Sequence, residues 1–94
     1  MVHVRELVWD AWNVGHIARH EVTPDEVEDV CRRDAYTSRT YKGRIRVIGQ
    51  TKSGRMLTVI LAPVQPETYY PVTARPASRR EREMYRSLER GVTE

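Results

Sequence analysis

Residues 44–62 read RIRVIGQTKSGRMLTVILA, and this stretch decides the fold class. Arg44 to Gln50 alternates between apolar and charged or polar side chains, which is the period of a half-buried strand. Lys52 to Gly54 supplies the small and polar residues typical of a tight turn. Met56 to Ala62 then returns as a mostly apolar strand, which suits the centre of a sheet. The stretch therefore predicts an antiparallel hairpin.

Shorter segments predict further strands around this hairpin. Val4 to Trp9 and Tyr36 to Tyr41 precede it, and Thr68 to Ala74 follows after a second turn at Pro63 to Pro66. Pro71 lies within the last of these segments and cannot donate a ladder hydrogen bond. We therefore expect an edge strand or a bulge there.

Two helices are predicted in the N-terminal third. Asp10 is a suitable N-cap for a short helix over Trp12 to His20, whose apolar stripe would be Val14, Ile17 and Ala18. A second helix follows the capping-box sequence at 23–26 and should run to about Arg33. Its core-facing residues would be Val27, Val30 and Cys31.

A third helix is predicted at the C-terminal end. Ser78 to Glu81 forms another capping box, the helix should reach about Arg90, and Gly91 is a suitable stop. The whole order is β-α-α-β-β-β-β-α, which predicts an α+β fold. We expect a single domain over residues 1–94, with an antiparallel four- to five-stranded sheet packed by two N-terminal helices and one C-terminal helix.

Composition narrows the class of protein. Of 94 residues, 39% are hydrophobic and 31% are charged, which is too apolar for a disordered chain and too polar for a membrane span. No signal peptide is visible, and the single Cys31 cannot form an internal disulfide, so we expect a cytoplasmic protein without a membrane partner. Residues 1–34 carry four basic and eight acidic side chains, whereas residues 35–94 carry twelve and five. This asymmetry favours a basic surface for a polyanion.

The C-terminal helix concentrates that positive charge. Arg79, Arg82, Arg86 and Arg90 recur at spacings of three and four, so they share one stripe. Each like-charge pair one turn apart costs about 0.2–0.5 kcal/mol, which a solvated surface tolerates and a polyanion would reverse. Tyr85 lies beside the stripe, where it is either a core-edge aromatic or a site residue.

Two further arginines each have two interpretations, whereas Glu81 has one. Arg75, between the last strand and the helix, is either an ion-pair partner or an anion clamp. Arg46 points away from the face that carries Ile45 and Val47, and the same two readings apply to it. Glu81 is explained by the capping box, and a carboxylate engaged in capping is a poor general base.

His16 and His20 share a helix face, a spacing that can hold a metal or present a general base. The intervening residues do not form the zinc-protease motif, and a third ligand would have to come from Asp10, Glu21 or His3. We expect hydrogen bonds that hold the helix end rather than a metal site.

The ordered set of motifs resembles the BrnT family of type II toxins. The resemblance begins with Trp9-Asp10, Asn13, the segment 16–20 (HIARH) and the segment 22–27 (VTPDEV). It continues through 46–49 (RVIG), 54–57 (GRML), 73–77 (TARPA) and 80–82 (RER) with Tyr85. These motifs span nearly the whole chain in the family's order.

The resemblance implies a RelE-like fold and a metal-independent endoribonuclease that cuts RNA and blocks translation. It implies no cofactor. The expected partner is a ribbon-helix-helix antitoxin, through which alone the protein would reach operator DNA. The positions that match the family's polar motifs are Arg46, Arg55, Arg75, Glu81, Arg82 and Tyr85, with His20 at the helix end.

Under the ribonuclease hypothesis, a 2′-hydroxyl attacks the adjacent phosphorus, so the site needs a base, an acid and cations. Arg46, Arg75 and Arg82 would bind the phosphate, and either Glu81 or His20 would be the base.

Tyr85 would orient the phosphate or donate a proton, and Arg55, Arg79 and Arg86 would contact further RNA phosphates. The second hypothesis is a module that binds nucleic acid or an acidic antitoxin segment without cleavage. A third is a scaffold whose arginine stripe is merely solvated.

Overall fold

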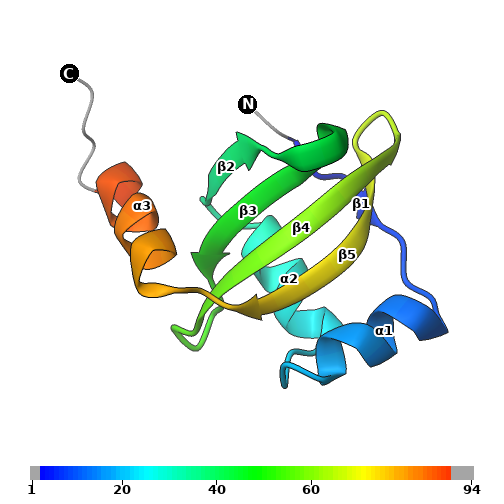
Figure 1. Ribbon diagram of the computed structural model, residues 1–94, viewed down its shortest axis with the longest axis horizontal. Coiled ribbons are helices and arrows are strands. Elements are labelled where there is room, and N and C mark those ends of the chain that lie inside the picture. The colour runs from blue at the N-terminus through cyan, green and yellow to red at the C-terminus, as the bar shows by residue number, and fades with distance from the viewer. Residues whose placement is uncertain (1–2, 90–94) are drawn as a thin grey trace.

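The computed structural model describes residues 3–89, which form a five-stranded sheet and three α-helices (Figure 1). The strands are β1 (Glu6–Leu7), β2 (Tyr36–Arg39), β3 (Ile45–Gln50), β4 (Met56–Gln65) and β5 (Thr68–Pro76). The helices are α1 (Ala11–Ala18), α2 (Pro24–Cys31) and α3 (Arg79–Glu89), with a short 3-10 turn η1 (Tyr41–Gly43). The predicted α+β class is confirmed. Arg90 and Gly91, expected at the end of the last helix, lie outside the described residues.

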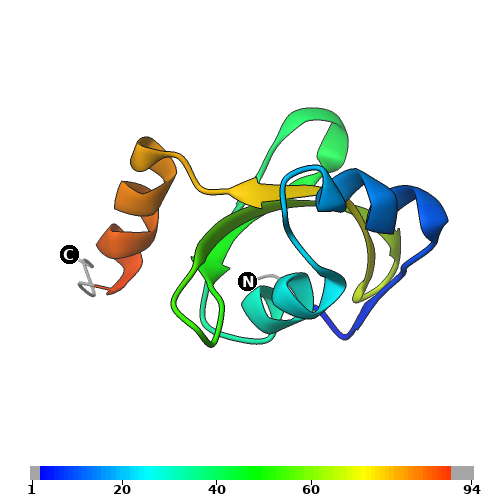
Figure 2. The same ribbon diagram turned by 90° about the horizontal axis from the view of Figure 1, so that it is seen from below.

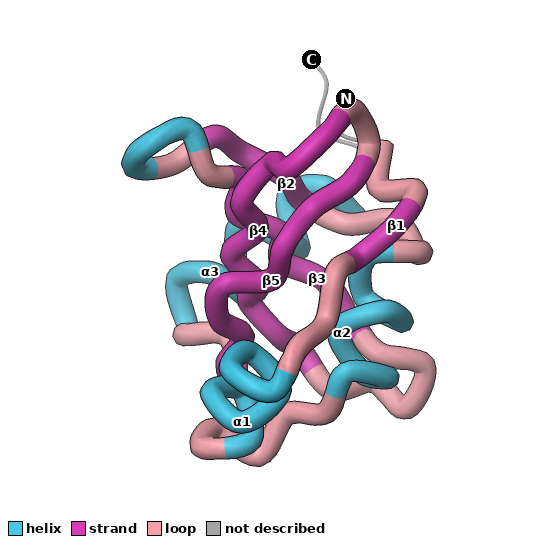
Figure 3. Tube along the Cα trace, turned by 90° about the vertical axis from the view of Figure 1, so that its right-hand side faces the viewer, coloured by secondary structure: helices cyan, strands magenta, loops and turns pink. Residues whose placement is uncertain are grey.

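The sheet has the order β1-β5-β4-β3-β2 and is mixed rather than wholly antiparallel. β2, β3, β4 and β5 pair antiparallel in sequence order, as predicted. The expectation of a purely antiparallel sheet is wrong at one edge, where β1 runs parallel to β5. Figure 3 shows β1 on that side of the sheet. The two strands come from opposite ends of the chain, so no hairpin turn sets their direction. The amide nitrogen of Val8 donates to the carbonyl of Tyr69 at 2.9 Å and extends this pairing.

The predicted hairpin of β3 and β4 forms the middle of the sheet. Its register runs from Ile45 opposite Leu61 to Gln50 opposite Met56. Gly54 closes the turn with a φ of +97°, a conformation that favours glycine. β4 lies third among the five strands, so its predicted central position is confirmed.

The β4–β5 hairpin contains a bulge at the proline singled out by the sequence. Ile60 faces Thr73, but Leu61 faces Pro71, so one extra residue of β5 is accommodated between the pairs. Because β5 lies between β4 and β1, the proline marks a bulge and not an edge strand. β4 also extends to Gln65, beyond the turn expected at Pro63, since the chain reverses only after that residue.

α2 packs on one face of the sheet over the main hydrophobic core, and α1 lies against β5 at the border of that core (Figures 1 and 2). Its fully or nearly buried members are Leu7, Ile17, Val22, Val27, Val30, Ile45, Val47, Leu57, Val59, Leu61 and Ala74. The stripe predicted for α1 is wrong at two positions, because Val14 and Ala18 are exposed. Asn13 is buried instead, and its amide nitrogen donates to the carbonyls of Val8 at 2.9 Å and Pro71 at 3.1 Å. These bonds satisfy the polar side chain inside the core.

α3 packs separately, beyond one end of the sheet, where it contacts side chains of the opposite face (Figure 2). A second, smaller cluster holds it there, formed by Ile48, Ala77 and Tyr85 with partly buried Tyr36, Met56 and Met84. Elsewhere on that face, no helix of residues 3–89 covers the middle strands (Figures 1 and 2). None of the described helices is long and apolar enough to cross a membrane.

Candidate functional site

The uncovered face of the sheet brings two of the predicted site residues onto neighbouring cross-strand rows. One row is formed by Ser38, Arg46, Ile60 and Thr73, and the next by Tyr36, Ile48, Thr58 and Arg75. Paired residues in a ladder point to the same face of a sheet. Arg46 and Arg75 therefore share the face opposite the main core, and Arg75 lies where β5 leads into α3.

A bidentate ion pair joins the end of β5 to the start of α3. Arg75 Nη1 donates to Glu81 Oε1 and Arg75 Nη2 donates to Glu81 Oε2, both at 2.8 Å. Glu81 Oε1 also accepts from the backbone nitrogen of Ser78 and from Thr58 Oγ1, each at 2.8 Å. The amide of Glu81 donates back to Ser78 Oγ at 3.2 Å, so the predicted capping box is present.

These contacts keep Glu81 ionised although the residue is only 7% exposed. The bonds from Arg75 lower the pKa of the Glu81 carboxyl from an ordinary 4.5 to about 2, against the opposing effect of burial. Bonds from Ser78 and Thr58 lower the pKa further. The same pairing raises the pKa of Arg75. At neutral pH the pair is thus a fixed charge pair, and a carboxylate with so low a pKa is a weak proton acceptor.

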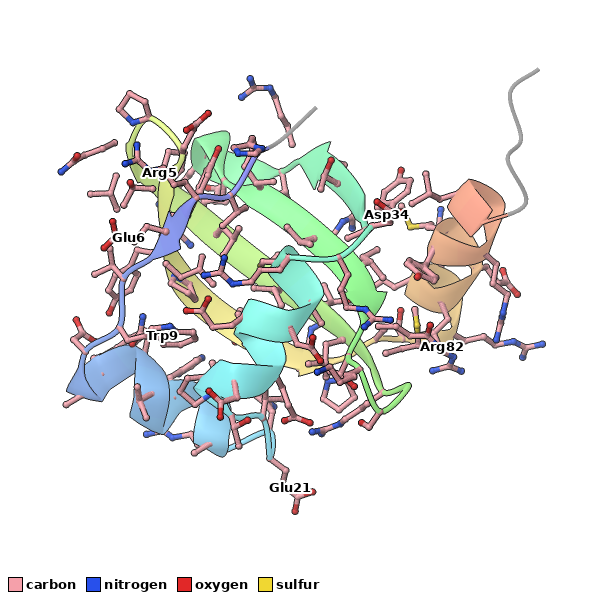
Figure 4. The ribbon with its side chains drawn as sticks, turned by 180° about the vertical axis from the view of Figure 1, so that it is seen from behind. Arg5, Glu6, Trp9, Glu21, Asp34 and Arg82 are labelled. Carbon is pink, nitrogen blue, oxygen red and sulfur yellow. The ribbon has the colours of Figure 1, made fainter. Side chains whose placement is uncertain are left out.

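Two more arginines flank this pair. Arg82 Nη1 donates to the carbonyl of Ala77 at 2.9 Å, which holds its side chain beside the junction between β5 and α3 (Figure 4). Arg46 Nε donates to Ser38 Oγ at 3.3 Å across the β2–β3 ladder. Each bond uses only part of a guanidinium, which carries five N–H donors in all. Both side chains are half-buried and retain donors for a ligand.

The remaining residues predicted on α3 divide between surface and core. Arg79 and Arg86 are exposed and extend the stripe that contains Arg82 along the helix. Tyr85 is only 9% exposed and packs in the second cluster with Ile48 and Ala77. Its position therefore fits the core-edge interpretation of the sequence.

His20 and Arg55 lie together, away from this cluster. Arg55 Nη1 donates to both carboxylate oxygens of Glu26 at 3.0 Å and to the carbonyl of Glu21 at 2.7 Å, and Arg55 Nη2 donates to the carbonyl of His20 at 3.4 Å. Figure 4 shows Glu21 at the loop after α1, well separated from Arg82 on α3. The structure thus joins Arg55 to the α1–α2 loop and not to Arg75.

His16 on α1 and His20 in the loop after it are engaged with aromatic neighbours. The ring of His16 stacks on Trp12 with centroids 4.9 Å apart, and it meets His20 edge-on at 6.0 Å. Within residues 3–89, no group of three or more His, Cys, Asp or Glu side chains is placed to hold a metal ion. His3 and Glu21, considered as third ligands, do not complete such a group.

Sequence reasoning missed Thr58 as a member of the site. Thr58 is fully buried on β4, and its hydroxyl reaches the Glu81 carboxylate. One signal was present, because Thr58 is the one polar residue in the apolar run from Met56 to Ala62. A buried hydroxyl requires a hydrogen-bond partner, and the sequence did not indicate which residue that was.

Comparison with known proteins supports the fold. No family model matches the sequence, and no curated protein matches it. Among solved structures, the chain is similar to the 1.1 Å crystal structure of the ribonuclease toxin BrnT from Brucella abortus. The TM-score is 0.64 at 26% sequence identity, and the match covers 79% of this chain and 97% of that one. The resemblance to BrnT inferred from the motifs is therefore confirmed at the level of structure.

Proposed function

We propose that the chain is the toxin of a toxin–antitoxin pair and acts as a metal-independent endoribonuclease. The observation that carries the proposal is the open sheet face, on which Arg75 is held by Glu81 at the foot of α3. The similarity to a ribonuclease toxin supports the same reaction class. The RNA strand would lie across this face, with its backbone toward α3.

The arginines suit the charge that develops during cleavage. When the 2′-hydroxyl attacks phosphorus, negative charge builds up on the non-bridging oxygens, and preorganised donors stabilise it. Glu81 uses one N–H from each terminal nitrogen of Arg75, and the other N–H of Nη1 donates to the carbonyl of Pro76 at 3.4 Å. The Nε–H and the second N–H of Nη2 are left for phosphate. Arg46 and Arg82 would complete the contact, and Arg79 and Arg86 would bind flanking phosphates.

The proton acceptor has to be assigned differently from the sequence-based choice of Glu81 or His20. Glu81, with a pKa of about 2, is suited to orienting Arg75 and not to removing a proton. His20 lies in the loop after α1, apart from the cluster. We infer that solvent accepts the 2′-hydroxyl proton and protonates the 5′-oxygen as the P–O5′ bond breaks, which leaves a 2′,3′-cyclic phosphate. Catalysis then rests on phosphate binding, while Tyr85 supports α3 from the core side.

The partner and the cellular role follow from the same proposal. The toxin would block translation in the cytoplasm and be neutralised by a ribbon-helix-helix antitoxin, through which the complex would reach operator DNA. The charge asymmetry supports an acidic partner segment, because residues 35–94 carry twelve basic and five acidic side chains.

Cleavage of a long unstructured RNA in EDTA tests the proposal. The purified protein should cut the RNA, and Arg75→Ala, matched for fold by circular dichroism, should not. Equal cleavage by both proteins would contradict the assignment of Arg75.

A second function is favoured by the lack of a histidine beside Arg75 in the described residues. On this reading, the chain binds RNA or an antitoxin and acts only as a regulator. It predicts salt-sensitive RNA binding without strand scission.

A further inference from the structure

Thr58 is a buried polar residue near the start of β4, the central strand of the sheet. Its register partners are Ile48 on β3 and Arg75 on β5, so its side chain lies in the same row as the arginine. Thr58 is fully buried, and its Oγ1 donates to Glu81 Oε1 at 2.8 Å. The hydroxyl therefore lies inside the junction of sheet and helix, beneath the ion pair.

The two carboxylate oxygens of Glu81 are used unequally. Oε1 accepts three hydrogen bonds, from Thr58 Oγ1, the backbone of Ser78 and Arg75 Nη1, each 2.8 Å long. Oε2 accepts from Arg75 Nη2. A carboxylate rotates freely about its last carbon–carbon bond unless an oxygen is fixed. The donors to Oε1 therefore help to fix the orientation of the carboxylate plane. The planar guanidinium of Arg75 pairs with both oxygens and takes up the matching orientation.

Thr58 differs from the other donors in where it comes from. Arg75 and Ser78 belong to the same segment as Glu81, at the end of β5 and the start of α3. Thr58 is on β4, in the middle of the sheet. It therefore ties the carboxylate to a second strand of the sheet, next to the strand that carries Arg75.

We propose that Thr58 is a positioning residue, which orients the phosphate-binding edge of Arg75 through Glu81 without touching RNA. The inference rests on the proposed ribonuclease function. If packing alone mattered at this position, valine would serve as well, because it has nearly the same shape and a high strand propensity. The hydroxyl is needed only if its bond to Glu81 matters.

The test compares Thr58→Val with Thr58→Ser, which keeps the hydroxyl. Val59→Ala on the same strand is the control, because Val59 faces the main core and its truncation lowers stability without altering the Glu81 contacts. Steady-state cleavage of a defined RNA gives kcat and KM. NMR titration of the Glu81 carboxyl and exchange of the Arg75 guanidinium protons report the positioning itself.

In Thr58→Val, kcat should fall by about ten- to a hundredfold with KM changed less than kcat, since small misplacements of positioning groups have effects of this size. The Glu81 pKa should rise and the Arg75 guanidinium should rotate faster, whereas Thr58→Ser and Val59→Ala should match the wild type. Unchanged kcat and NMR parameters in Thr58→Val would overturn the proposal. If the wild type does not cleave RNA, the proposed function fails, and the NMR comparison alone decides whether Thr58 positions Arg75.

Discussion

Arg75 and Glu81 face each other across the corner between the sheet and α3, joined by two hydrogen bonds of 2.8 Å. The arginine is the penultimate residue of β5, and the glutamate lies in the first turn of α3. Under the proposed function, the cation that would bind a phosphate is thus the same group that fixes the helix to the sheet. Stability and ligand binding are therefore coupled at this corner, and variants there must be tested for both.

Replacing Arg75 should abolish most cleavage while leaving the protein folded. Arg75→Ala removes a preorganised donor, and the loss of one such donor lowers kcat by on the order of a hundredfold or more. It also leaves the Glu81 carboxylate without its strongest partner, at a cost of about 1–3 kcal/mol in the free energy of unfolding. RNA cleavage and urea unfolding measure the two effects.

Arg80→Ala is the matched control for Arg75→Ala, because Arg80 is exposed on α3 and makes no side-chain contact described above. It should retain cleavage and stability. An Arg75→Ala protein that cleaves like Arg80→Ala would remove Arg75 from the site.

The Glu81 carboxyl should make stability fall in acid. Its pKa in the folded protein is about 2, below the ordinary 4.5, so the ionised group stabilises the fold above pH 4.5. This contribution is lost as the pH falls from about 4.5 to 2. A shift of this size corresponds to about 3 kcal/mol.

Urea unfolding of wild type and Glu81→Gln at pH 6 and pH 2 measures this contribution. The wild type should lose about 2–3 kcal/mol more than the variant, because the other carboxylates are common to both proteins. Equal losses would show that Glu81 titrates normally in the folded protein.

A methyl group at position 49 should destabilise the fold. A Cβ on Gly49 would lie 3.1 Å from both Ala35 Cβ and Val30 Cγ1, where α2 packs against β3. Overpacking of this kind costs about 1–3 kcal/mol. Gly15→Ala is the control, since a Cβ there meets nothing within 4 Å and the exposed helix should gain stability. The midpoint temperature of thermal unfolding should fall for Gly49→Ala and rise for Gly15→Ala. Shifts in the same direction would contradict the packing described for Gly49.

The pair of Arg55 and Glu26 should contribute more than an exposed ion pair. Arg55 contacts both carboxylate oxygens of Glu26 at 3.0 Å, and Glu26 also caps α2. A double-mutant cycle with Arg55→Met and Glu26→Gln should give a coupling of about 1 kcal/mol. The cycle for Arg32 and Glu28, an exposed pair one turn apart at 3.0 Å, should give about 0.3–0.5 kcal/mol. A coupling between Arg55 and Glu26 no larger than that between Arg32 and Glu28 would contradict the structural role of Arg55.

Local patterns predicted the elements of this fold well, because the hydrophobic period and the capping residues of each element lie within a few consecutive positions. Alternation in β3 and capping boxes at Thr23 and Ser78 placed a strand and two helix starts where the structure has them. The parallel pairing of β1 with β5 could not be predicted, since it joins segments some sixty residues apart that lack a connecting turn. Asn13 was missed because an amide in the core is recognised only once its distant acceptor, Pro71, is known.

The charged residues of the candidate site could be predicted from the sequence, whereas the residues with which they pair could not. The sequence left Arg75 as either an ion-pair partner or an anion clamp, and the structure shows the ion pair with Glu81. It placed Arg55 among the RNA phosphate contacts and His20 as a candidate base of the same site, yet packing places both at the α1–α2 loop. The sequence shows directly which residues are charged, whereas their ion-pair partners depend on which strands and helices become neighbours in the fold.

Salt dependence of RNA binding separates the arginine stripe from the rest of the surface. Each phosphate that a side chain neutralises on single-stranded RNA adds about 0.7 to the slope of log affinity against log salt. Arg79→Ala and Arg86→Ala should each lower that slope by about 0.7 without altering the fold, because both side chains are exposed on α3. Arg5→Ala is the control, since Figure 4 shows Arg5 at the end of the molecule away from α3. Fluorescence anisotropy with a labelled oligonucleotide measures the slope. If all three variants keep the wild-type slope, the stripe is merely solvated and the RNA contacts lie elsewhere.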